Sequence, residues 1–261
     1  MQKEHSQINE SAWSERSYEA WVNRYGLPHE AAQRIKKDPA GRLSSLYKHI
    51  GDVNGKKVIN LLGSHGSKAI ALSLLGADTT VVDISSENAR YANELAEAAS
   101  THIRYIVSDV LELPSSELSS DYDLVLIELG ILHYFTDLQP FIRIISQLLR
   151  VGGLLVLQDF HPVSTKLITS SGKKHKVTGD YFSTTLEESD VAYIKFLPDM
   201  EFVTKEEKKH LTVRLRKWTL GEIITAIASE GLFIKLLIEE GNTKPVDLGI
   251  PKTFTLVAEK V

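Results

Sequence analysis

Apolar residues recur along the chain with two periods, and their order predicts alternating strands and helices. Short, nearly continuous apolar runs are typical of strands buried on both faces. They read VINLL (58–62), TTVVD (79–83), IRYIVSD (103–109), YDLVLIEL (122–129), LLVLQDF (154–160), LFIKLLIEE (232–240) and TFTLVAEK (253–260). Between them lie helical stripes with their own start signals: Ser85 and Ser86 before Ala89, Pro140 in a first turn, and Thr219 with Glu222 as a capping box. The pattern predicts an α/β fold: a doubly wound, mostly parallel, seven-stranded Rossmann-like sheet.

Two segments depart from this alternation. From Ser11 to Ile50 the pattern predicts three short amphipathic helices, which we expect over the open edge at the strand ends. From 161 to 218 it predicts an inserted hairpin with strands VAYIKFL (191–197) and LTVRLRKW (211–218). We therefore divide the chain into a helical lid, 1–54, and a main domain, 55–261, with 161–218 as a substrate-side subdomain.

Composition narrows the class of protein without identifying it. The chain has 261 residues, of which 43% are hydrophobic and 25% charged, with a net charge of −4. These values predict a soluble folded protein and disfavour nucleic acid as a partner. Cysteine is absent, which excludes disulfides and thiolate chemistry. No apolar stretch has the length of a signal peptide or a membrane span, so we expect a cytoplasmic protein without a membrane partner.

In such sheets a ligand binds beyond the carboxyl ends of the strands. Gly63, Ser64 and Gly66 follow the first strand, where small residues let the backbone approach a ligand and a helix N-terminus follows. The same glycines could simply form a tight turn. Asp83, twenty residues after Gly63, is placed to accept hydrogen bonds from a ribose diol, or else to cap the next helix. Asp109, which follows the third strand, could likewise accept a hydrogen bond from an adenine amino group, or else cap the turn that follows it.

These motifs, with their order and spacing, resemble the class I S-adenosylmethionine-dependent methyltransferases. The resemblance covers about 56–153 and again 219 to the end, through NLLGSHGSKA, VVDIS, SDVLELP, LVLIELGILHYF and LLRVGG. It implies the class I methyltransferase fold, S-adenosyl-L-methionine as cofactor and in-line methyl transfer to an acceptor, for which a small molecule is favoured. The sequence departs from the family where Ser64 and His65 stand in place of the second glycine of its Gly-x-Gly turn.

The resemblance also assigns roles to residues. Gly63 and Gly66 would lie against the methionine portion and ribose, and Asp83 would hold the ribose hydroxyls. Asp109 and Val110 would frame the adenine, and Glu128 and Leu129 would line the cleft. The complete predicted cofactor set is Leu62, Gly63, Ser64, Gly66, Asp83, Ile84, Asp109, Val110, Glu128 and Leu129.

Two other functions share parts of this pattern. An NAD(P)-dependent oxidoreductase has the same first strand–helix–strand unit, but here the third glycine of its motif is displaced to Ala69. A non-catalytic protein that senses S-adenosylmethionine would carry identical motifs. Only turnover separates a sensor from an enzyme.

Two histidines are candidates for acid–base chemistry. His133 follows the fourth strand and His161 the fifth, and either could orient or deprotonate an acceptor or serve only as a structural rim residue. We expect His161 to face the cleft, because Pro162 turns the chain away after it. With Asp159 and Glu128 these histidines could hold a metal, but nothing shows metal-ligand spacing, and we predict none. The inserted hairpin is also a candidate homodimer surface.

Overall fold

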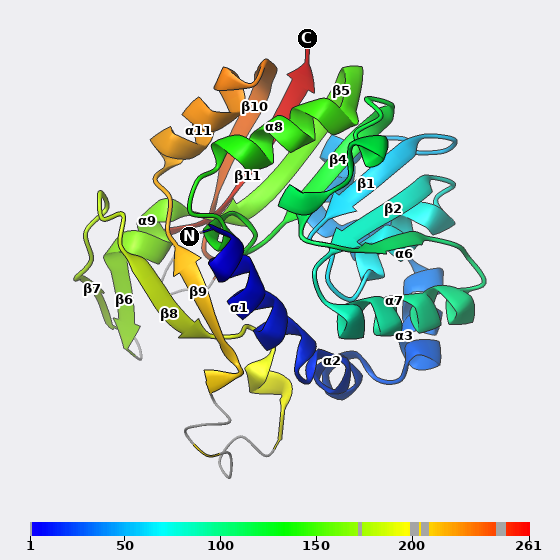
Figure 1. Ribbon diagram of the computed structural model, residues 1–261, viewed down its shortest axis with the longest axis horizontal. Coiled ribbons are helices and arrows are strands. Elements are labelled where there is room, and N and C mark those ends of the chain that lie inside the picture. The colour runs from blue at the N-terminus through cyan, green and yellow to red at the C-terminus, as the bar shows by residue number, and fades with distance from the viewer. Residues whose placement is uncertain (1, 172–173, 199–203, 205–208, 244–248) are drawn as a thin grey trace.

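A single seven-stranded sheet organises the computed structural model, which describes residues 2–171, 174–198, 204, 209–243 and 249–261. Its strands are β1 (Lys57–Leu61), β2 (Asp78–Asp83), β3 (Arg104–Val107), β4 (Tyr122–Glu128), β5 (Leu149–Phe160), β10 (Leu232–Gly241) and β11 (Pro251–Lys260). They lie in the order β10-β11-β5-β4-β1-β2-β3, and β11 is antiparallel to both of its neighbours (Figure 1). The predicted doubly wound, mostly parallel sheet is confirmed.

Crossover helices cover both faces of this sheet. The residues of β4 alternate between two cores: Leu124 and Leu126 pack in one, and Val125 and Ile127 in the other. The first core holds α6 (Ser67–Leu74) and α7 (Ser86–Ala99), and the second holds α8 (Gln139–Leu148) and α11 (Leu220–Ser229). Because both faces are buried, the strands appear in the sequence as continuous apolar runs.

The N-terminal helices divide between two places. They are α1 (Gln2–Ser14), α2 (Ser17–Tyr25), α3 (Pro28–Lys37), α4 (Pro39–Leu43) and α5 (Tyr47–Ile50), so helix begins well before the predicted Ser11. Only α1 and α2 reach over the strand ends with much of their length. α3 packs on α7 and α4 on α6, and Leu43 and Leu46 are fully buried in the first core. The expectation that all these helices cover the strand ends is therefore wrong for α3 to α5.

The insertion contains α9 (Pro162–Leu167) and two small hairpins. β6 (Ile168–Ser171) pairs with β7 (Lys174–Val177), and β8 (Leu186–Asp190) pairs with β9 (Thr212–Arg216). The strand predicted in LTVRLRKW is confirmed as β9. The one predicted in VAYIKFL is wrong, because that segment forms a turn and the short 3-10 helix η5 (Ile194–Phe196). A homodimer surface on this insertion stays a prediction.

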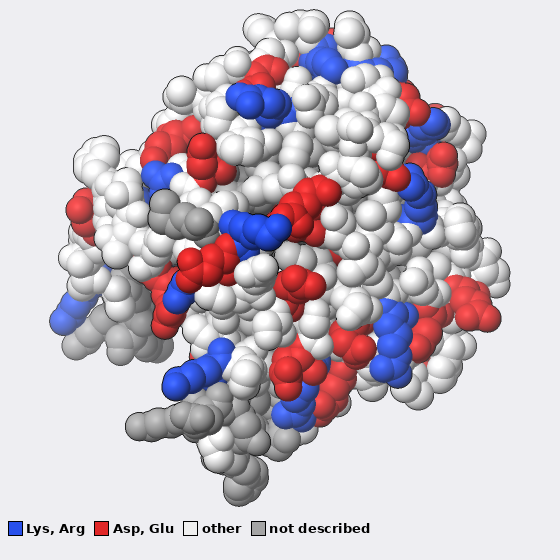
Figure 2. All heavy atoms as spheres, in the orientation of Figure 1, with Lys and Arg blue, Asp and Glu red and all other residues white. Residues whose placement is uncertain are grey.

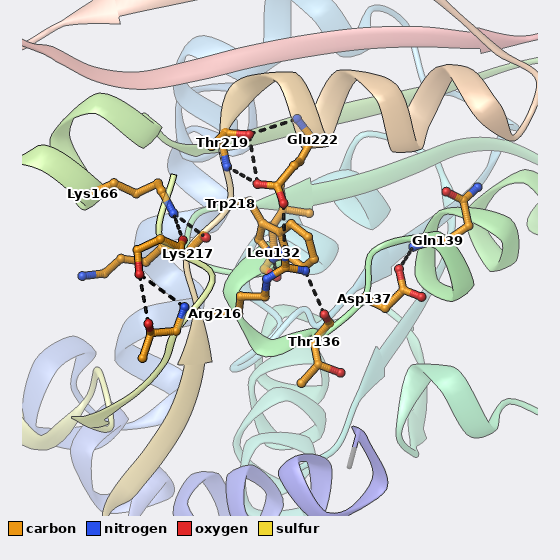
Figure 3. A network of polar contacts seen from close by, with 12 residues as sticks. Leu132, Thr136, Asp137, Gln139, Lys166, Arg216, Lys217, Trp218, Thr219 and Glu222 are labelled. Atoms are coloured by element: carbon orange, nitrogen blue, oxygen red, sulfur yellow. Dashed lines mark hydrogen bonds and ion pairs between the residues drawn. The ribbon is translucent and has the colours of Figure 1, made fainter. Parts of the chain in front are cut away.

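Helix caps lie where the sequence indicates them. The Ser85 hydroxyl accepts the Asn88 N–H at the start of α7. At α11, Thr219 and Glu222 form the reciprocal capping box, with the Glu222 carboxylate accepting from both the N–H and the hydroxyl of Thr219 (Figure 3). None of the helices in the described ranges combines the length and the apolar character that crossing a bilayer requires.

Candidate functional site

A pocket of about 560 Å³ opens at the carboxyl ends of β1, β2 and β4. Most residues of the predicted site line it together, although they come from separate parts of the chain. They are Leu62, Gly63, Ser64, Asp83, Ile84, Asp109, Val110, Glu128, Leu129 and His133. Gly66 and His161 do not line it. The central strands β1 and β4 diverge here to their crossovers on opposite faces, which is the switch point where α/β sheets bind ligands.

Close packing against neighbouring side chains requires glycine at two positions of the loop after β1. Gly66 has a φ of +70°, and a Cβ there would lie 2.7 Å from the Cβ of Ala92. A Cβ on Gly63 would lie 2.7 Å from both the Asn60 Oδ1 and a methyl of Val81. Both glycines are therefore required by the packing of the loop. Gly63 also lines the pocket, whereas Gly66 faces Ala92, so the ligand contact that we predicted for Gly66 is not found.

Ser64 occupies a strained conformation in this loop. Its φ is +48°, a region that favours glycine, and its buried Oγ has no hydrogen-bond partner among the residues that the structure describes. The Ser64 N–H donates to Asp83 Oδ2 at 2.9 Å, and its carbonyl accepts from the Tyr105 hydroxyl at 2.7 Å. The backbone is held from β2 and β3, while the Ser64 hydroxyl is left without a partner among the described residues.

Asp83 is buried at the end of β2, and most of its acceptor capacity is already used. Oδ1 accepts from the Ser85 N–H at 3.0 Å and the Asn88 side chain at 3.1 Å, while Oδ2 accepts, among the described residues, only from the Ser64 N–H. Burial raises the pKa of Asp83, and these hydrogen bonds oppose the rise. Since the side chain of Ser85, not of Asp83, caps α7, the capping alternative is wrong. A carboxylate oxygen has about two acceptor positions, so Oδ2 keeps one for a ligand hydroxyl.

Three further residues of the predicted cofactor set, Asp109, Glu128 and Leu129, line the pocket at the carboxyl ends of β3 and β4. The Asp109 carboxylate accepts the Leu111 N–H at 3.0 Å and so caps the turn η2 (Val110–Glu112), as the capping interpretation predicts. Glu128 is paired with Lys68, which stands at the start of α6. Leu129 has a φ of +38° where the chain leaves β4. Backbone strain therefore occurs at both central loops, as is common at functional sites.

His65 packs in an aromatic box that the sequence did not reveal. Its ring stands edge-on to those of Trp21 and Tyr25, with centroids 4.8 and 4.7 Å apart. Burial, helped by Arg42 and Arg24, lowers the pKa of His65 to about 3. The imidazole is therefore neutral at any physiological pH.

The loop after β4 carries His133 and is held from several directions. The Trp218 indole donates to the Leu132 carbonyl at 2.9 Å, and Arg216 donates to the Thr136 carbonyl at 2.9 Å (Figure 3). From α1, Gln2 accepts the Thr136 N–H at 2.7 Å. Burial lowers the pKa of His133, and its ring forms no hydrogen bond with any residue that the structure describes. A neutral imidazole with available ring nitrogens therefore faces the pocket.

His161 lies outside the pocket, and the expectation that it faces the cleft is wrong. It is 2% exposed and caps α9, with Nδ1 accepting the Val163 N–H at 3.1 Å. Nε2 therefore carries the proton and donates to Glu239 at 2.6 Å. Pro162 turns the chain as predicted, but in doing so it begins α9 and encloses the imidazole. Both ring nitrogens are used, so the arrangement is structural.

The pocket is also lined by the N-terminal helices and the insertion, where we expected a lid and a substrate-side subdomain, although the individual residues were not predicted. The N-terminal helices contribute Gln2, Ser6, Asn9, Trp13, Trp21, Arg24, Tyr25 and Arg42, and the insertion contributes Ser189, Asp190, Ala192, Val213 and Leu215. The aromatic residues of α1 and α2 were visible in the sequence, but they fitted a core equally well. Within the described ranges, no three histidine or acidic side chains are grouped so that they could hold a metal. Figure 2 shows cationic and anionic side chains interspersed over the face that it draws.

Comparison with known proteins finds similarity to methyltransferases. Residues 62–157 match the family model described as a methyltransferase domain. No curated protein matches the chain. A Listeria monocytogenes protein assigned to the S-adenosylmethionine-dependent methyltransferases has a similar structure, with a TM-score of 0.66 and 20% identity over 85% of this chain and 99% of that one. A Mesorhizobium loti S-adenosylmethionine-dependent methyltransferase gives 0.64 and 20% over 86% and 99%. Magnesium protoporphyrin IX methyltransferase from Synechocystis PCC 6803, solved with bound SAH, gives 0.58 and 15% over 98% and 100%. At these identities the structures establish the shared fold.

The strain at Ser64 gives a test of the loop. Ser64→Gly should raise the free energy of unfolding without ligand by up to about 1 kcal/mol, because glycine adopts positive φ freely. Ser64→Ala removes the same hydroxyl but keeps the strained Cβ, so it is the matched control. Urea denaturation measures both. A glycine variant no more stable than the alanine variant would contradict the assignment of strain.

The neutral His65 predicts a dependence of stability on pH. Its pKa is near 3 when folded and near 6.5 when unfolded, so the unfolded state binds more protons between these values and stability falls as the pH drops below 6.5. The loss is about 1.4 kcal/mol per pH unit, or about 2 kcal/mol at pH 5. His65→Phe keeps an aromatic ring and should remove this part of the loss in urea denaturation at pH 7.5 and 5. His29→Phe, at an exposed histidine, should retain it; equal pH dependence in all three proteins would contradict the prediction.

Proposed function

We propose that this chain, whose residues 62–157 match a methyltransferase domain, is a class I S-adenosylmethionine-dependent methyltransferase that methylates a small molecule held between the sheet and the N-terminal helices. The observation that carries this proposal is the composition of one pocket. The strand-end residues that hold the cofactor in this family line it together with a neutral histidine, His133, and residues of α1 and the insertion.

The residues around the loops of β1 and β2 fit S-adenosyl-L-methionine, the cofactor of this family. When bound, it supplies a methyl group on a positively charged sulfur, an activated electrophile whose leaving group is neutral. The open acceptor position on Asp83 Oδ2 fits one ribose hydroxyl, and the orphaned Ser64 hydroxyl fits a polar group beside it. Asp109 and Val110 border the same pocket beyond β3, where the resemblance expects the adenine.

Two arginine side chains of the N-terminal helices are suited to bind the carboxylate of the methionine portion of the cofactor. Arg24 and Arg42 both line the pocket next to His65. Arg42 donates to the Ser67 hydroxyl at 3.0 Å, and Arg24 lies over the rings of Tyr25 and Phe196. Among the described residues neither forms an ion pair with a carboxylate of the protein. A guanidinium group suits a carboxylate through paired N–H donors.

The residues around His133 suit two tasks: aligning the acceptor with the methyl group and removing a proton from the acceptor. The main contribution of the chain is to hold the acceptor in line with the methyl–sulfur bond and to exclude water. In intramolecular model reactions, such positioning lowers the activation free energy by several kcal/mol. His133 is neutral and available, so it can take a proton from an acceptor atom that carries one. Trp13, Val213 and Leu215 add an apolar wall for the body of a small molecule.

Asp83→Ala should weaken binding of S-adenosylmethionine about ten- to 150-fold, because a hydrogen bond to a charged group contributes about 1.5–3 kcal/mol. Titration calorimetry measures the change. Asp78→Ala is the matched control, since Asp78 lies exposed at the other end of the same strand and should leave the affinity unchanged. Unchanged affinity in a folded Asp83→Ala protein would remove Asp83 from the site.

The function itself is tested by incubating the protein with cell extract and a radiolabelled methyl donor. We expect label in the small-molecule fraction, and about ten- to 150-fold slower labelling by Asp83→Ala at a donor concentration well below the dissociation constants of both proteins. Tight donor binding without label in the small-molecule, protein or RNA fractions would identify a sensor instead. Tight binding of a nicotinamide dinucleotide with none of the methyl donor would point to an oxidoreductase.

A further inference from the structure

One buried carboxylate next to the pocket is not used by the proposed chemistry. Asp159 lies near the end of β5, is 5% exposed and does not line the pocket. It therefore touches neither cofactor nor acceptor. A buried carboxylate is costly unless its oxygens accept hydrogen bonds, so what satisfies Asp159 indicates its role.

Four backbone N–H groups satisfy it, and three of them belong to the loop after β4. Oδ1 accepts from Gly130 at 2.6 Å and from Phe160 at 2.7 Å. Oδ2 accepts from Ile131 at 3.2 Å and from Leu132 at 3.1 Å. Gly130 has a φ of +82°, which turns the chain so that successive N–H groups point to one carboxylate.

The residue that follows this anchored backbone is His133. It lies in the short helix η4 (Leu132–Tyr134), directly after the third anchored N–H group. The loop thus places His133 in the pocket, and Asp159 holds the loop. Asp159 is also the charge that raises the pKa of His133 against the lowering by burial and by Lys217.

We propose that Asp159 is a positioning residue that fixes the backbone carrying His133 and stabilises the imidazolium formed when His133 takes a proton. This inference rests on the proposed role of His133. The proton leaves the acceptor atom for a ring nitrogen, the imidazole becomes a cation, and water receives the proton after the product leaves. The negative charge of Asp159 favours that cation without bonding to it.

Among the described residues, two charged groups act on His133. From β5 comes Asp159, and from the segment between β9 and α11 comes Lys217, which is paired with Glu187 at 2.7 Å. The Tyr134 ring stands 4.4 Å from the imidazole ring, and its hydroxyl accepts from the Trp13 indole at 3.1 Å. Among the described groups, Asp159 is therefore the one that favours protonated His133.

The test is the titration of His133, followed by NMR in the wild-type protein and in Asp159→Asn. The asparagine removes the charge, while Trp218 and Gln2 still hold the loop. We expect the pKa of His133 to fall. A merely structural role predicts the opposite sign, because a loosened loop would let water reach the ring and raise its pKa toward the ordinary value. An unchanged or raised pKa therefore overturns the proposal.

Asp123→Asn is the matched control. Asp123 also accepts a backbone N–H, from Lys57, but at the opposite end of β4, so its loss should leave the pKa of His133 unchanged. If Asp159→Asn does not fold, hydrogen exchange in the wild-type protein decides. The amides of Gly130, Ile131 and Leu132 should be protected, and rapid exchange of all three would overturn the proposal.

A second readout separates this proposal from the proposed function. Donor binding by Asp159→Asn should fall much less than by Asp83→Ala, whereas labelling of the small-molecule fraction should fall about tenfold or more. Undiminished labelling would remove Asp159 from the reaction and leave the methyltransferase assignment intact. If the wild-type protein labels nothing, the proposed function fails, while the titration still reports on Asp159 and His133.

Discussion

Two buried carboxylates hold the loops on which the site depends. β1 and β4 are the central strands, and β2 and β5 flank them. From β2, Asp83 accepts the N–H of Ser64 in the loop after β1. From β5, Asp159 accepts three N–H groups in the loop after β4. β2 thus fixes the loop after β1, and β5 fixes the loop after β4. The pocket opens between these two loops.

This arrangement follows from the geometry of parallel strands. Their carboxyl ends meet at one edge, where loops leave backbone N–H groups without ladder partners. A carboxylate there satisfies several N–H groups at once, and those bonds offset the cost of burying its charge. The loops can then hold strained residues such as Ser64 and Leu129, because their backbones are anchored at several points.

The covers over the pocket are joined to each other. The Tyr193 hydroxyl in the insertion donates to the carbonyl of Ala12 in α1 at 2.6 Å, and Asn9 pairs with the backbone of Arg214 in β9. Trp13 packs against Tyr193 with ring centroids 5.5 Å apart. α1 and the insertion are therefore one packed wall, and α4 and α5 continue into the core beneath. Removing residues 1–50 would expose that core, because Leu43 and Leu46 are buried in it.

Local periodicity predicted the elements that form the sheet and missed those shaped by distant contacts. Thr219 and Glu222 cap α11 within a few residues of each other, so the sequence displayed the motif. In contrast, α1 buries His5, Asn9 and Ala12, a stripe with too little apolar character to be visible. Val191 and Tyr193 alternate as in a strand, but Tyr193 is buried because its hydroxyl reaches α1.

The same distinction explains why the strand-end wall of the pocket could be predicted and the opposite wall could not. Asp83 and the loop after β1 lie within a strand–helix–strand unit, where spacing along the chain fixes position in space. The wall formed by α1 and the insertion joins Asn9 to a backbone 205 residues away and Gln2 to a loop 134 residues away. No spacing encodes such contacts, because they depend on how finished elements pack. His133 and His161 show this most directly. Each follows a strand end, yet only the fold decides that one faces the pocket while Glu239 and α9 enclose the other.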